Sequence, residues 1–435
     1  MQTSKTLRLH HLNSPDAFTE LVAALSANGM GVLEVATHHI GQRYIYRDVT
    51  VSVPAEDDLD TLLTTVRLLP GIIVESVVDE VLRVHEGGKM VHRGRFEVTT
   101  FAQLREVYTP GVAKVCREIQ RDPELARRYT NAGNTVAVIS NGSRVLGLGN
   151  IGPLACLPVM EAKAMFYSQL VGLNAVPIVL DAYGVDRVVA TVERLAVGFA
   201  AIHLEDIQTP DCIEIEQRLA ERLPIPVMHD DQHGTAIVTL AAVHNLLRSA
   251  GRNLSDSTFA QVGLGAAGLA IATLVTAAGG AHVLGCDRSP AARALAEARG
   301  VECVEFEEAI ARADVLCMTT GISRLLKPER VRKGQVILAL SNPSPEIEPA
   351  DALNAGAAAA LDGRSVNNLL AYPGVFRGAI DARARAITTR MKLRAAEAIA
   401  GCAKAGEILP DPLGAEPHRA VAEAVRKAAA EEAND

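Results

Sequence analysis

Apolar and polar positions in the first eighty residues alternate with two different periods. Runs with an apolar residue at every second position predict strands, and runs with apolar residues three or four positions apart predict helices. In chain order these are strand 7–11, helix 14–28, strand 31–38, strand 44–53, helix 57–69 and strand 72–84. This βαββαβ order predicts a small sheet with both helices on one face. A polar connector, residues 86–95, follows, so we expect a first domain over residues 1–87.

From residue 103 onward, helical patterns alternate with short strands rich in β-branched residues. Such alternation predicts parallel sheets built from βαβ units, and hence an α/β protein. We expect an α/β catalytic domain over residues 88–234 and a Rossmann-like, doubly wound dinucleotide-binding domain with C-terminal helices over residues 235–435. The predicted strands are residues 135–139, 175–180, 201–203, 227–229, 258–262, 282–286, 315–318 and 336–339.

The composition is that of an ordinary globular chain. Its 435 residues are 49% hydrophobic and 22% charged, with a formal net charge of -8. This balance argues against a nucleic-acid partner, because nucleic-acid binders need a concentrated basic field. Residues 1–15 lack an apolar signal segment, no stretch is apolar enough to cross a membrane, and the seven cysteines are scattered. We therefore expect a cytoplasmic protein with reduced thiols and no membrane partner.

The pattern G-x-G-x-x-G occurs twice, at residues 147–152 and 263–268. A dinucleotide fingerprint needs a strand before the first glycine, a helix after the last, and an acidic residue about 20 positions further on. The second copy has all three, and its acidic residue is Asp287. The first copy is followed by Pro153, and we interpret it as a turn that lines another pocket. The predicted dinucleotide-binding residues are Gly263, Gly265, Ala266, Ala267, Gly268 and Asp287.

The residue after the second predicted strand of this domain also bears on the choice of cofactor. Asp287 favours NAD, because a carboxylate at this place binds the ribose hydroxyls. Arg288 beside it could accept the 2′-phosphate of NADP. We therefore expect NAD, with NADP as the alternative.

Two pairs of carboxylates follow two predicted strands of the catalytic domain. Glu205 and Asp206 come after strand 201–203, and Asp230 and Asp231 come after strand 227–229. Ligands of open α/β sheets bind at the carboxyl ends of strands, so the four side chains could converge and would then require a cation. Oxygen ligands favour Mg²⁺ or Mn²⁺. The alternative is that each pair only caps the helix that follows it.

The first domain resembles the ACT domain, a regulatory module that binds small molecules. The likeness rests on the βαββαβ order and on the turn at residues 28–31, which matches the loop with which that family commonly binds an amino acid. The resemblance implies a small-molecule effector. A dimerisation module that binds nothing is the alternative, and a homodimer or higher homo-oligomer is expected in either case.

Six motifs follow one another in the rest of the chain. They are YTPGVA at 108–113, VLGLGNIG at 145–152, PVMEAK at 158–163, LED at 204–206, HDDQHGT at 229–235 and ALSNP at 339–343. Together they resemble the motifs of the malic enzymes, in particular the shorter bacterial kind, and the likeness covers residue 88 to the C-terminus.

This resemblance implies a role for individual residues in the oxidative decarboxylation of (S)-malate to pyruvate. Lys163 would be the general base, with Asp230 as its partner, and Tyr108 would protonate the product carbanion. The implied metal ligands are Glu205, Asp206 and Asp231. Residues implied in binding the substrate are Arg144, Lys163, Asn342, Asn367 and Asn368, and Asn342 would also contact the nicotinamide.

Two positions depart from the pattern of this family. Asn141 stands where an aspartate is usual, and Ala162 stands where a glycine commonly precedes the lysine. A metal-dependent, β-decarboxylating dehydrogenase of another 2-hydroxy acid is therefore an alternative. A second alternative is an amino-acid-sensing protein whose catalytic half is idle, and a third is an oxaloacetate decarboxylase without a dinucleotide.

Overall fold

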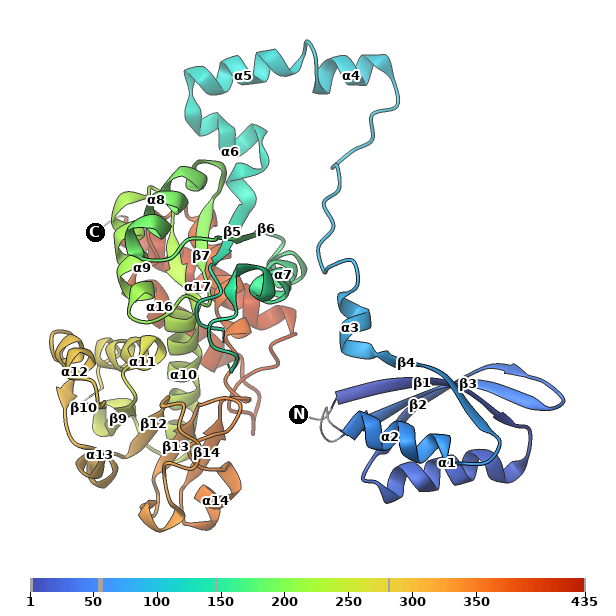
Figure 1. The fold of residues 1–435 in the computed structure, drawn as a ribbon. Helices are drawn as coiled ribbons and strands as arrows, with labels where there is room; N and C mark the ends of the chain where they lie inside the picture. The colour runs from blue at the N-terminus through green and yellow to red at the C-terminus, as the bar shows by residue number, and fades with distance from the viewer. Residues whose placement is uncertain (1–2, 54–57, 146, 281, 434–435) are drawn as a thin grey trace. The chain divides into compact units, whose positions relative to one another are not determined.

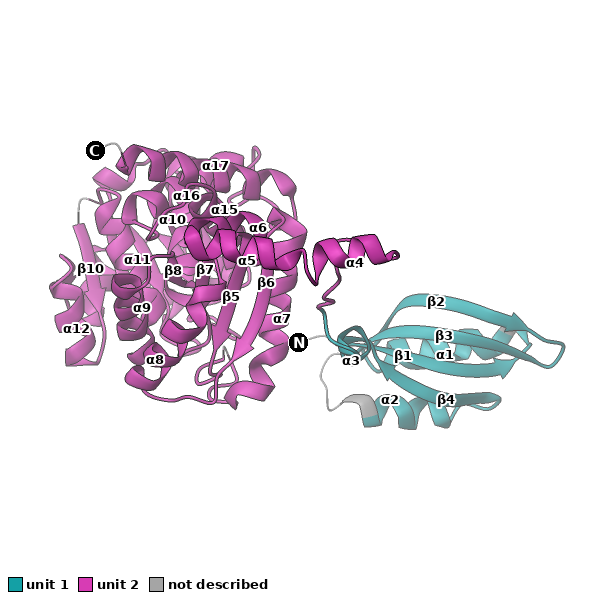
Figure 2. Cartoon of the chain, turned by 90° about the horizontal axis from the view of Figure 1, so that it is seen from above, with its two compact units in different colours: residues 1–89 teal, residues 90–435 magenta. Residues whose placement is uncertain are grey.

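The computed structural model describes residues 3–53, 58–145, 147–280 and 282–433. Its contacts divide the chain into two compact units, residues 1–89 and residues 90–435, which are coloured separately in Figure 2. The division falls within the polar connector that follows the first predicted domain. Residue 57 of the predicted helix 57–69, and Leu146 of the first glycine motif, lie outside the described residues.

The first unit has the predicted βαββαβ order. Its strands are β1 (Thr3–Leu12), β2 (Gly31–Ile40), β3 (Tyr44–Val53) and β4 (Ile72–Asp79), and its helices are α1 (Pro15–Ala27), α2 (Asp58–Arg67) and α3 (Glu80–His85). The sheet order is β2-β3-β1-β4, and the β1–β3, β1–β4 and β2–β3 pairs are antiparallel. Alternate strand residues, such as Leu7 and Leu9, share a buried core with Leu21 of α1 and Leu62 of α2. Both helices therefore pack on one face, as predicted.

The predicted strand 72–84 is too long. Strand β4 ends at Asp79, where helix α3 begins. The Asp79 carboxylate accepts a hydrogen bond from the backbone N–H of Leu82, which is the bond of a helix N-cap. Apolar residues continue beyond Asp79, at Val81, Leu82 and Val84, but the cap starts a helix there.

The second unit begins with short helices and a four-stranded parallel sheet. Its strand order is β6-β5-β7-β8, with β5 (Thr135–Ser140), β6 (Asn174–Val179), β7 (Ala201–Leu204) and β8 (Val227–His229). All four strands lie within one or two residues of the predicted ranges. The helices are α4 (Phe101–Val107), α5 (Val112–Arg121), α6 (Ala126–Tyr129), α7 (Gly152–Val171), α8 (Val185–Leu195) and α9 (Asp211–Arg222).

A six-stranded sheet completes this unit, with the order β11-β10-β9-β12-β13-β14 and parallel pairing throughout. Numbered from β9, this is the 3-2-1-4-5-6 order of a dinucleotide-binding fold. The strands are β9 (Thr258–Val262), β10 (His282–Cys286), β11 (Glu302–Cys303), β12 (Val315–Met318), β13 (Val336–Ala339) and β14 (Ala359–Asp362). The sequence pattern missed β11, which has two residues, and β14, which is rich in alanine, a poor strand former.

Helix α10 (Asp230–Ser249) joins the two parallel sheets and contains the predicted domain boundary at residue 234. It lies centrally in Figure 1, and one apolar core includes Val138 of β5, Ile237 of α10, Phe259 of β9 and Met391 of α16. Among the described residues, no helix has the length and apolar character needed to cross a membrane. The remaining helices are α11 (Ala266–Ala277), α12 (Pro290–Glu297), α13 (Phe306–Arg312), α14 (Pro349–Asn354), α15 (Tyr372–Asp381), α16 (Thr389–Cys402) and α17 (Ala415–Glu432).

Candidate active site

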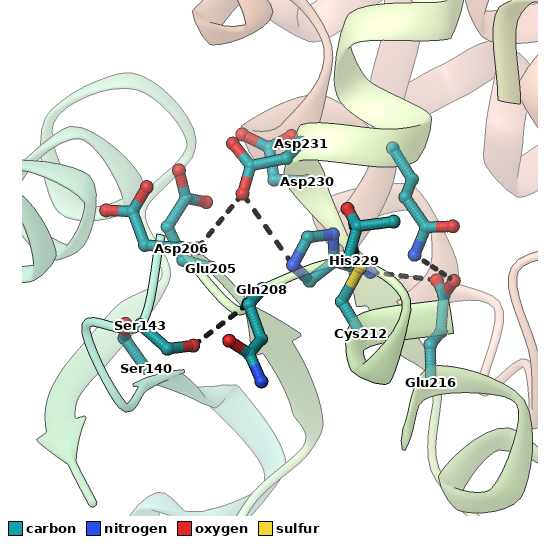
Figure 3. A network of polar contacts seen from close by, with 12 residues as sticks. Ser140, Ser143, Glu205, Asp206, Gln208, Cys212, Glu216, His229, Asp230 and Asp231 are labelled. Carbon is teal, nitrogen blue, oxygen red and sulfur yellow. Dashed lines mark hydrogen bonds and ion pairs between the residues drawn. The ribbon is translucent and has the colours of Figure 1, made fainter. Parts of the chain in front are cut away.

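The two acidic pairs meet at one edge of the four-stranded sheet. Strands β7 and β8 are parallel neighbours, and Leu204 pairs with His229 at their ends. The residues that follow these strands are therefore adjacent. The backbone N–H of Asp206 donates to Oδ2 of Asp231 over 3.0 Å, and carboxylate oxygens of Glu205, Asp206 and Asp231 all lie within 4.8 Å of one another (Figure 3).

This group fits a divalent cation. Glu205 and Asp206 are buried, and Oδ2 of Asp206 has no hydrogen-bond partner among the described residues. Burial, with like charges close by, raises the pKa of Glu205 to about 7 and that of Asp206 to about 8. Asp206 also has a left-handed backbone, with φ 53, a conformation that persists where surrounding structure enforces it. An oxygen-only site of this kind suits Mg²⁺ or Mn²⁺.

Lys163 lies against the acidic group. It stands on α7, is 13% exposed, and its Nζ is 2.5 Å from Oδ2 of Asp230 and 2.9 Å from Oε1 of Glu205. Nζ also lies 4.7 Å from the centre of the Tyr372 ring, a cation–π contact. Burial opposes the charge on Lys163, but Asp230 and Glu205 outweigh it and raise its pKa well above the ordinary value. A general base needs the opposite shift, so the lysine is held here in its charged form.

The Asp230 carboxylate is buried and closely packed by its neighbours. It is fully buried, burial raises its pKa to about 6, and its Oδ1 has no hydrogen-bond partner among the described residues. A β-carbon at Gly234 would overlap Oδ1 of Asp230 and would come within 3.3 Å of Cβ of Asn368. Asn368 therefore lies beside the acidic group, as a substrate-binding residue must.

Glu216 of α9 is a hydrogen-bond acceptor for residues at the start of helix α10. Its carboxylate accepts hydrogen bonds from the backbone N–H of His229 at 2.8 Å, from Nε2 of Gln232 at 3.0 Å and from Nε2 of His233 at 2.9 Å. His233 is thus a hydrogen-bonding neighbour of the site. His229 is fully buried, and its Nε2 lies 3.6 Å from Oδ2 of Asp231, beyond a hydrogen bond.

The second glycine motif has the geometry of a pyrophosphate-binding turn. Strand β9 ends at Val262, and Gly263 has φ +88, with the position of an added β-carbon 2.7 Å from the Thr319 carbonyl oxygen. An added β-carbon at Gly268 would overlap the carbonyl oxygen of Gly263, so helix and strand pack closely there. At Gly265 the same position is open, which leaves room for a ligand to approach the backbone.

Asp287 binds this turn from the end of β10. Its Oδ2 accepts from the backbone N–H of Leu264 at 2.7 Å, and its Oδ1 accepts from the N–H of Ser289 at 2.8 Å. Ala266 and Ala267 form the first turn of α11, where free N–H groups favour an anion. Arg288 is exposed beside Asp287.

The loops that carry the other predicted substrate residues approach one another. The β-carbon position of Gly147 lies 4.0 Å from Cδ of Pro343, so the first glycine motif contacts the loop that contains Asn342. The backbone N–H of Arg144 donates to the carbonyl oxygen of Asp206 at 3.1 Å, although its side chain is exposed. Asn367 is exposed, and its side chain caps the turn that follows it by accepting from the N–H of Leu369.

The structure does not bring Tyr108 to this group. Its side chain is 66% exposed, and among the described residues no hydrogen bond, ion pair or ring contact joins it to Lys163. It follows α4, and neither α4 nor α5 contains a buried residue. Large apolar side chains on this segment, called the arm below (residues 96–121), are exposed at Phe96, Phe101, Leu104, Val107 and Val112.

Together, a carboxylate cluster with a buried lysine and a dinucleotide fingerprint within one unit define a metal-assisted dehydrogenase. Comparison with known proteins narrows this class. Residues 96–220 match the family described as "Malic enzyme, N-terminal domain", and residues 231–324 match "D-isomer specific 2-hydroxyacid dehydrogenase, NAD binding domain".

Two similar proteins match this chain over almost its full length. NAD-dependent malic enzyme 1 of Bacillus subtilis is 47% identical over 427 residues, which cover 98% of this chain and 97% of that protein. NAD-dependent malic enzyme of Geobacillus stearothermophilus is 37% identical, over 93% and 88% of the two chains. The crystal structure of malic enzyme from Pyrococcus horikoshii has a TM-score of 0.76 and 38% identity, over 81% and 90%. The chain belongs to the malic enzyme family, and the resemblance seen in its motifs is confirmed.

The sequence reasoning missed four residues around this site. Two of them had a signal: Tyr167 stands one helical turn after Lys163, a spacing that places both on one face of α7, and His203 immediately precedes the Leu-Glu-Asp motif. Glu216 lies in α9 between the two acidic pairs, and Tyr372 comes from a distant part of the chain. Only the packing of α9 and α15 brings these two to the site.

Proposed function

We propose that this protein oxidatively decarboxylates (S)-malate to pyruvate and CO₂, with NAD as hydride acceptor and Mg²⁺ or Mn²⁺ as the metal. The observation that carries the proposal is the contact of Lys163 with Glu205 and Asp230, next to the ligand group of Glu205, Asp206 and Asp231. This one cluster offers a proton-transfer group and a cation site together. The relatives named NAD-dependent malic enzymes support the substrate and the dinucleotide.

The residues that would hold the two cofactors are distinct. Glu205, Asp206 and Asp231 would hold the cation, and the 263–268 turn with Asp287 would hold the dinucleotide. When bound, the dinucleotide supplies a hydride acceptor, and the cation supplies a Lewis acid that stabilises negative charge on the substrate. Both oxygens of Asp287 accept backbone hydrogen bonds, from Leu264 and Ser289. A carboxylate at this position supports NAD over NADP.

Lys163 has the geometry of the proton acceptor for the malate hydroxyl. In the structure two carboxylates keep it charged. A cation held by Glu205 would offset the part of the raised Lys163 pKa that this carboxylate causes. Lys163 takes the hydroxyl proton as hydride leaves C2. After CO₂ departs, Tyr108 gives its proton to C3, and pyruvate results.

Substrate recognition would rest on the loops around this cluster. Arg144 would pair with a carboxylate of malate through its two-pronged guanidinium group. Asn342, Asn367 and Asn368 would donate hydrogen bonds from the loops that follow β13 and β14, with Asn342 also facing the nicotinamide. The contact between Gly234 and Asn368 supports this placement.

A homodimer or higher homo-oligomer would cover the arm. Phe101 is 85% exposed and Tyr108 66%, and a segment with such exposed apolar side chains gains stability when a second copy buries them. Tyr108 would then act in a site that both copies complete. The free thiols of the described chain support a cytoplasmic location.

The first unit would bind a small-molecule effector in the manner of an ACT domain. Its βαββαβ order supports this, as does the Gly29 turn, where φ is +74. The alternative that this unit serves only to join two copies is supported by the exposed apolar residues of edge strand β2, Leu33 and Ile40.

The decisive assay is steady-state turnover of (S)-malate with NAD or NADP, with and without Mn²⁺. We expect turnover that requires Mn²⁺ and is faster with NAD. A panel of larger 2-hydroxy acids tests the runner-up, since a far higher kcat/KM for one of them would replace malate as the substrate. Absence of turnover with every dinucleotide and metal would leave the sensor with an idle catalytic half and the oxaloacetate decarboxylase, which a decarboxylation assay without dinucleotide separates.

A further inference from the structure

A buried line of hydrogen bonds runs from helix α7 to Glu205. The hydroxyl of Tyr167 lies 2.7 Å from Nδ1 of His203, and Nε2 of His203 lies 2.6 Å from Oε2 of Glu205. Tyr167 and His203 are 0% exposed, and Glu205 is 3% exposed. The proposed reaction assigns no task to Tyr167 or His203.

The surroundings of His203 are aromatic. Its ring stacks on Phe376 with centroids 5.5 Å apart, and it meets Tyr167 and Tyr372 edge to face. A polar ring in such a place is destabilising unless its nitrogens are hydrogen-bonded. Both nitrogens of His203 have a hydrogen-bond partner. Tyr167 and His203 therefore form a fully hydrogen-bonded connection to Glu205 through an apolar layer.

The direction of the two bonds follows from their partners. A carboxylate accepts, so Nε2 of His203 carries the hydrogen that is donated to Glu205. With that hydrogen on Nε2, Nδ1 of the neutral ring has a free lone pair and accepts from the Tyr167 hydroxyl. Tyr167 thereby selects the tautomer of His203 that can bind Glu205.

The two oxygens of Glu205 are therefore unequal. Oε2 is engaged by His203, while Oε1 lies 2.9 Å from Nζ of Lys163. Nitrogen and oxygen atoms of His203, Glu205 and Asp230 also lie within 4.8 Å of one another, but Lys163 already bridges Glu205 and Asp230 there. His203 thus serves as a donor to the carboxylate rather than as a metal ligand.

We propose that His203, oriented by Tyr167, is a positioning residue that fixes the Glu205 carboxylate and presents its Oε1 to the divalent cation. This inference rests on the proposed metal site. It adds two residues of the core to the determinants of metal affinity. Partners of this kind change metal affinity about 10- to 100-fold when they are removed.

The test is direct binding of Mn²⁺ to the full-length protein, without malate or dinucleotide, by titration calorimetry. We expect His203→Leu to raise the Kd for Mn²⁺ about 10- to 100-fold, because Glu205 loses its donor. His203→Gln keeps an amide donor within reach of Glu205 and should recover most of the affinity. Tyr167→Phe keeps the ring and removes only the hydroxyl, and it should weaken binding several-fold.

Phe376→Leu is the matched control, because it disturbs the packing on His203 without touching a hydrogen bond. It should lower the thermal midpoint and leave the Kd unchanged. Wild-type Mn²⁺ affinity in Tyr167→Phe, with a loss in Phe376→Leu, would overturn the proposal, and this comparison remains decisive where His203→Leu fails to fold.

Glu205→Gln separates this inference from the metal site on which it rests. Wild type that binds Mn²⁺ and a Glu205→Gln variant that does not would uphold the metal site. If the His203 and Tyr167 variants then bind as tightly as wild type, only the positioning role is refuted. Wild type without Mn²⁺ binding refutes the metal site, and the positioning role with it.

Discussion

A side chain at Gly234 would overlap the carboxylate of Asp230. Gly234 lies in the first turns of α10, and its lack of a β-carbon lets Asp230 reach Lys163 at 2.5 Å. We expect Gly234→Ala to keep the helix, since alanine favours it, but to displace Asp230 and reduce kcat about 100-fold. Gly401→Ala is the control, because that helical position has open space around it. Wild-type kcat in Gly234→Ala would argue against a role for the Asp230–Lys163 pair.

Removal of the Lys163 side chain tests the assigned base. We expect Lys163→Ala to lose about 100- to 10,000-fold in kcat, the range that proton-transfer groups contribute. The metal ligands stay in place, so Mn²⁺ binding measured by calorimetry should persist. Lys327→Ala, at an exposed position outside the arm and the site, is the control for loss of a lysine. Retained turnover in Lys163→Ala would refute the assignment.

A mixture of two inactive variants tests whether Tyr108 acts in the partner's site. Tyr108→Phe and Lys163→Ala are each expected to be nearly inactive. If the arm of one copy completes the site of the other, mixed dimers contain one intact site, and a refolded equal mixture should regain about a quarter of wild-type activity. No recovery in verified mixed dimers would place Tyr108 in the site of its own chain.

The Glu216 carboxylate gives the fold a defined dependence on pH. Burial alone would raise its pKa, but its neighbours, His233 first, lower it from 4.5 to about 2. A depressed folded-state pKa adds stability that is present above pH 4.5 and is lost as the pH falls toward 2. The difference is on the order of 3 kcal/mol.

We therefore expect Glu216→Gln to lower the midpoint of urea unfolding at pH 7, with a smaller effect as the pH falls below 4.5. Glu214→Gln serves as the control on the same helix, because that side chain is 60% exposed. An effect of Glu216→Gln that is constant from pH 7 to pH 3 would contradict the assignment of this stability to the charged carboxylate.

Much of this architecture follows from local patterns. The strands that precede the acidic pairs and the glycine turn are fully or largely buried, each contains at least one β-branched residue, and their ranges matched the prediction closely. Carboxylates at the ends of neighbouring strands could be expected to converge, because parallel strands end at one edge of a sheet. The meeting of Glu205, Asp206 and Asp231 agrees with that reasoning.

Other parts depend on contacts that no local pattern contains. The Asp79 cap ended a strand although apolar residues continue beyond it. Tyr372 contacts Lys163 although the two residues lie far apart in the sequence. The charge state of Lys163 depends on how closely Glu205 and Asp230 approach it. Such electrostatic consequences depend on distances of a few ångströms, which spacing along the chain does not determine.

Helix α10 begins at Asp230 and Asp231, and its far end is tied to the C-terminal helices by Asn245, whose Nδ2 donates to the carbonyl oxygens of Ala400 and Ile408 at 2.9 and 2.8 Å. The same helix runs through the core that both parallel sheets share. Residues 90–435 should therefore melt in a single cooperative transition. A substitution that creates a cavity near Asn245, some 20 Å along the helix from the carboxylates, would weaken cation binding without contacting them.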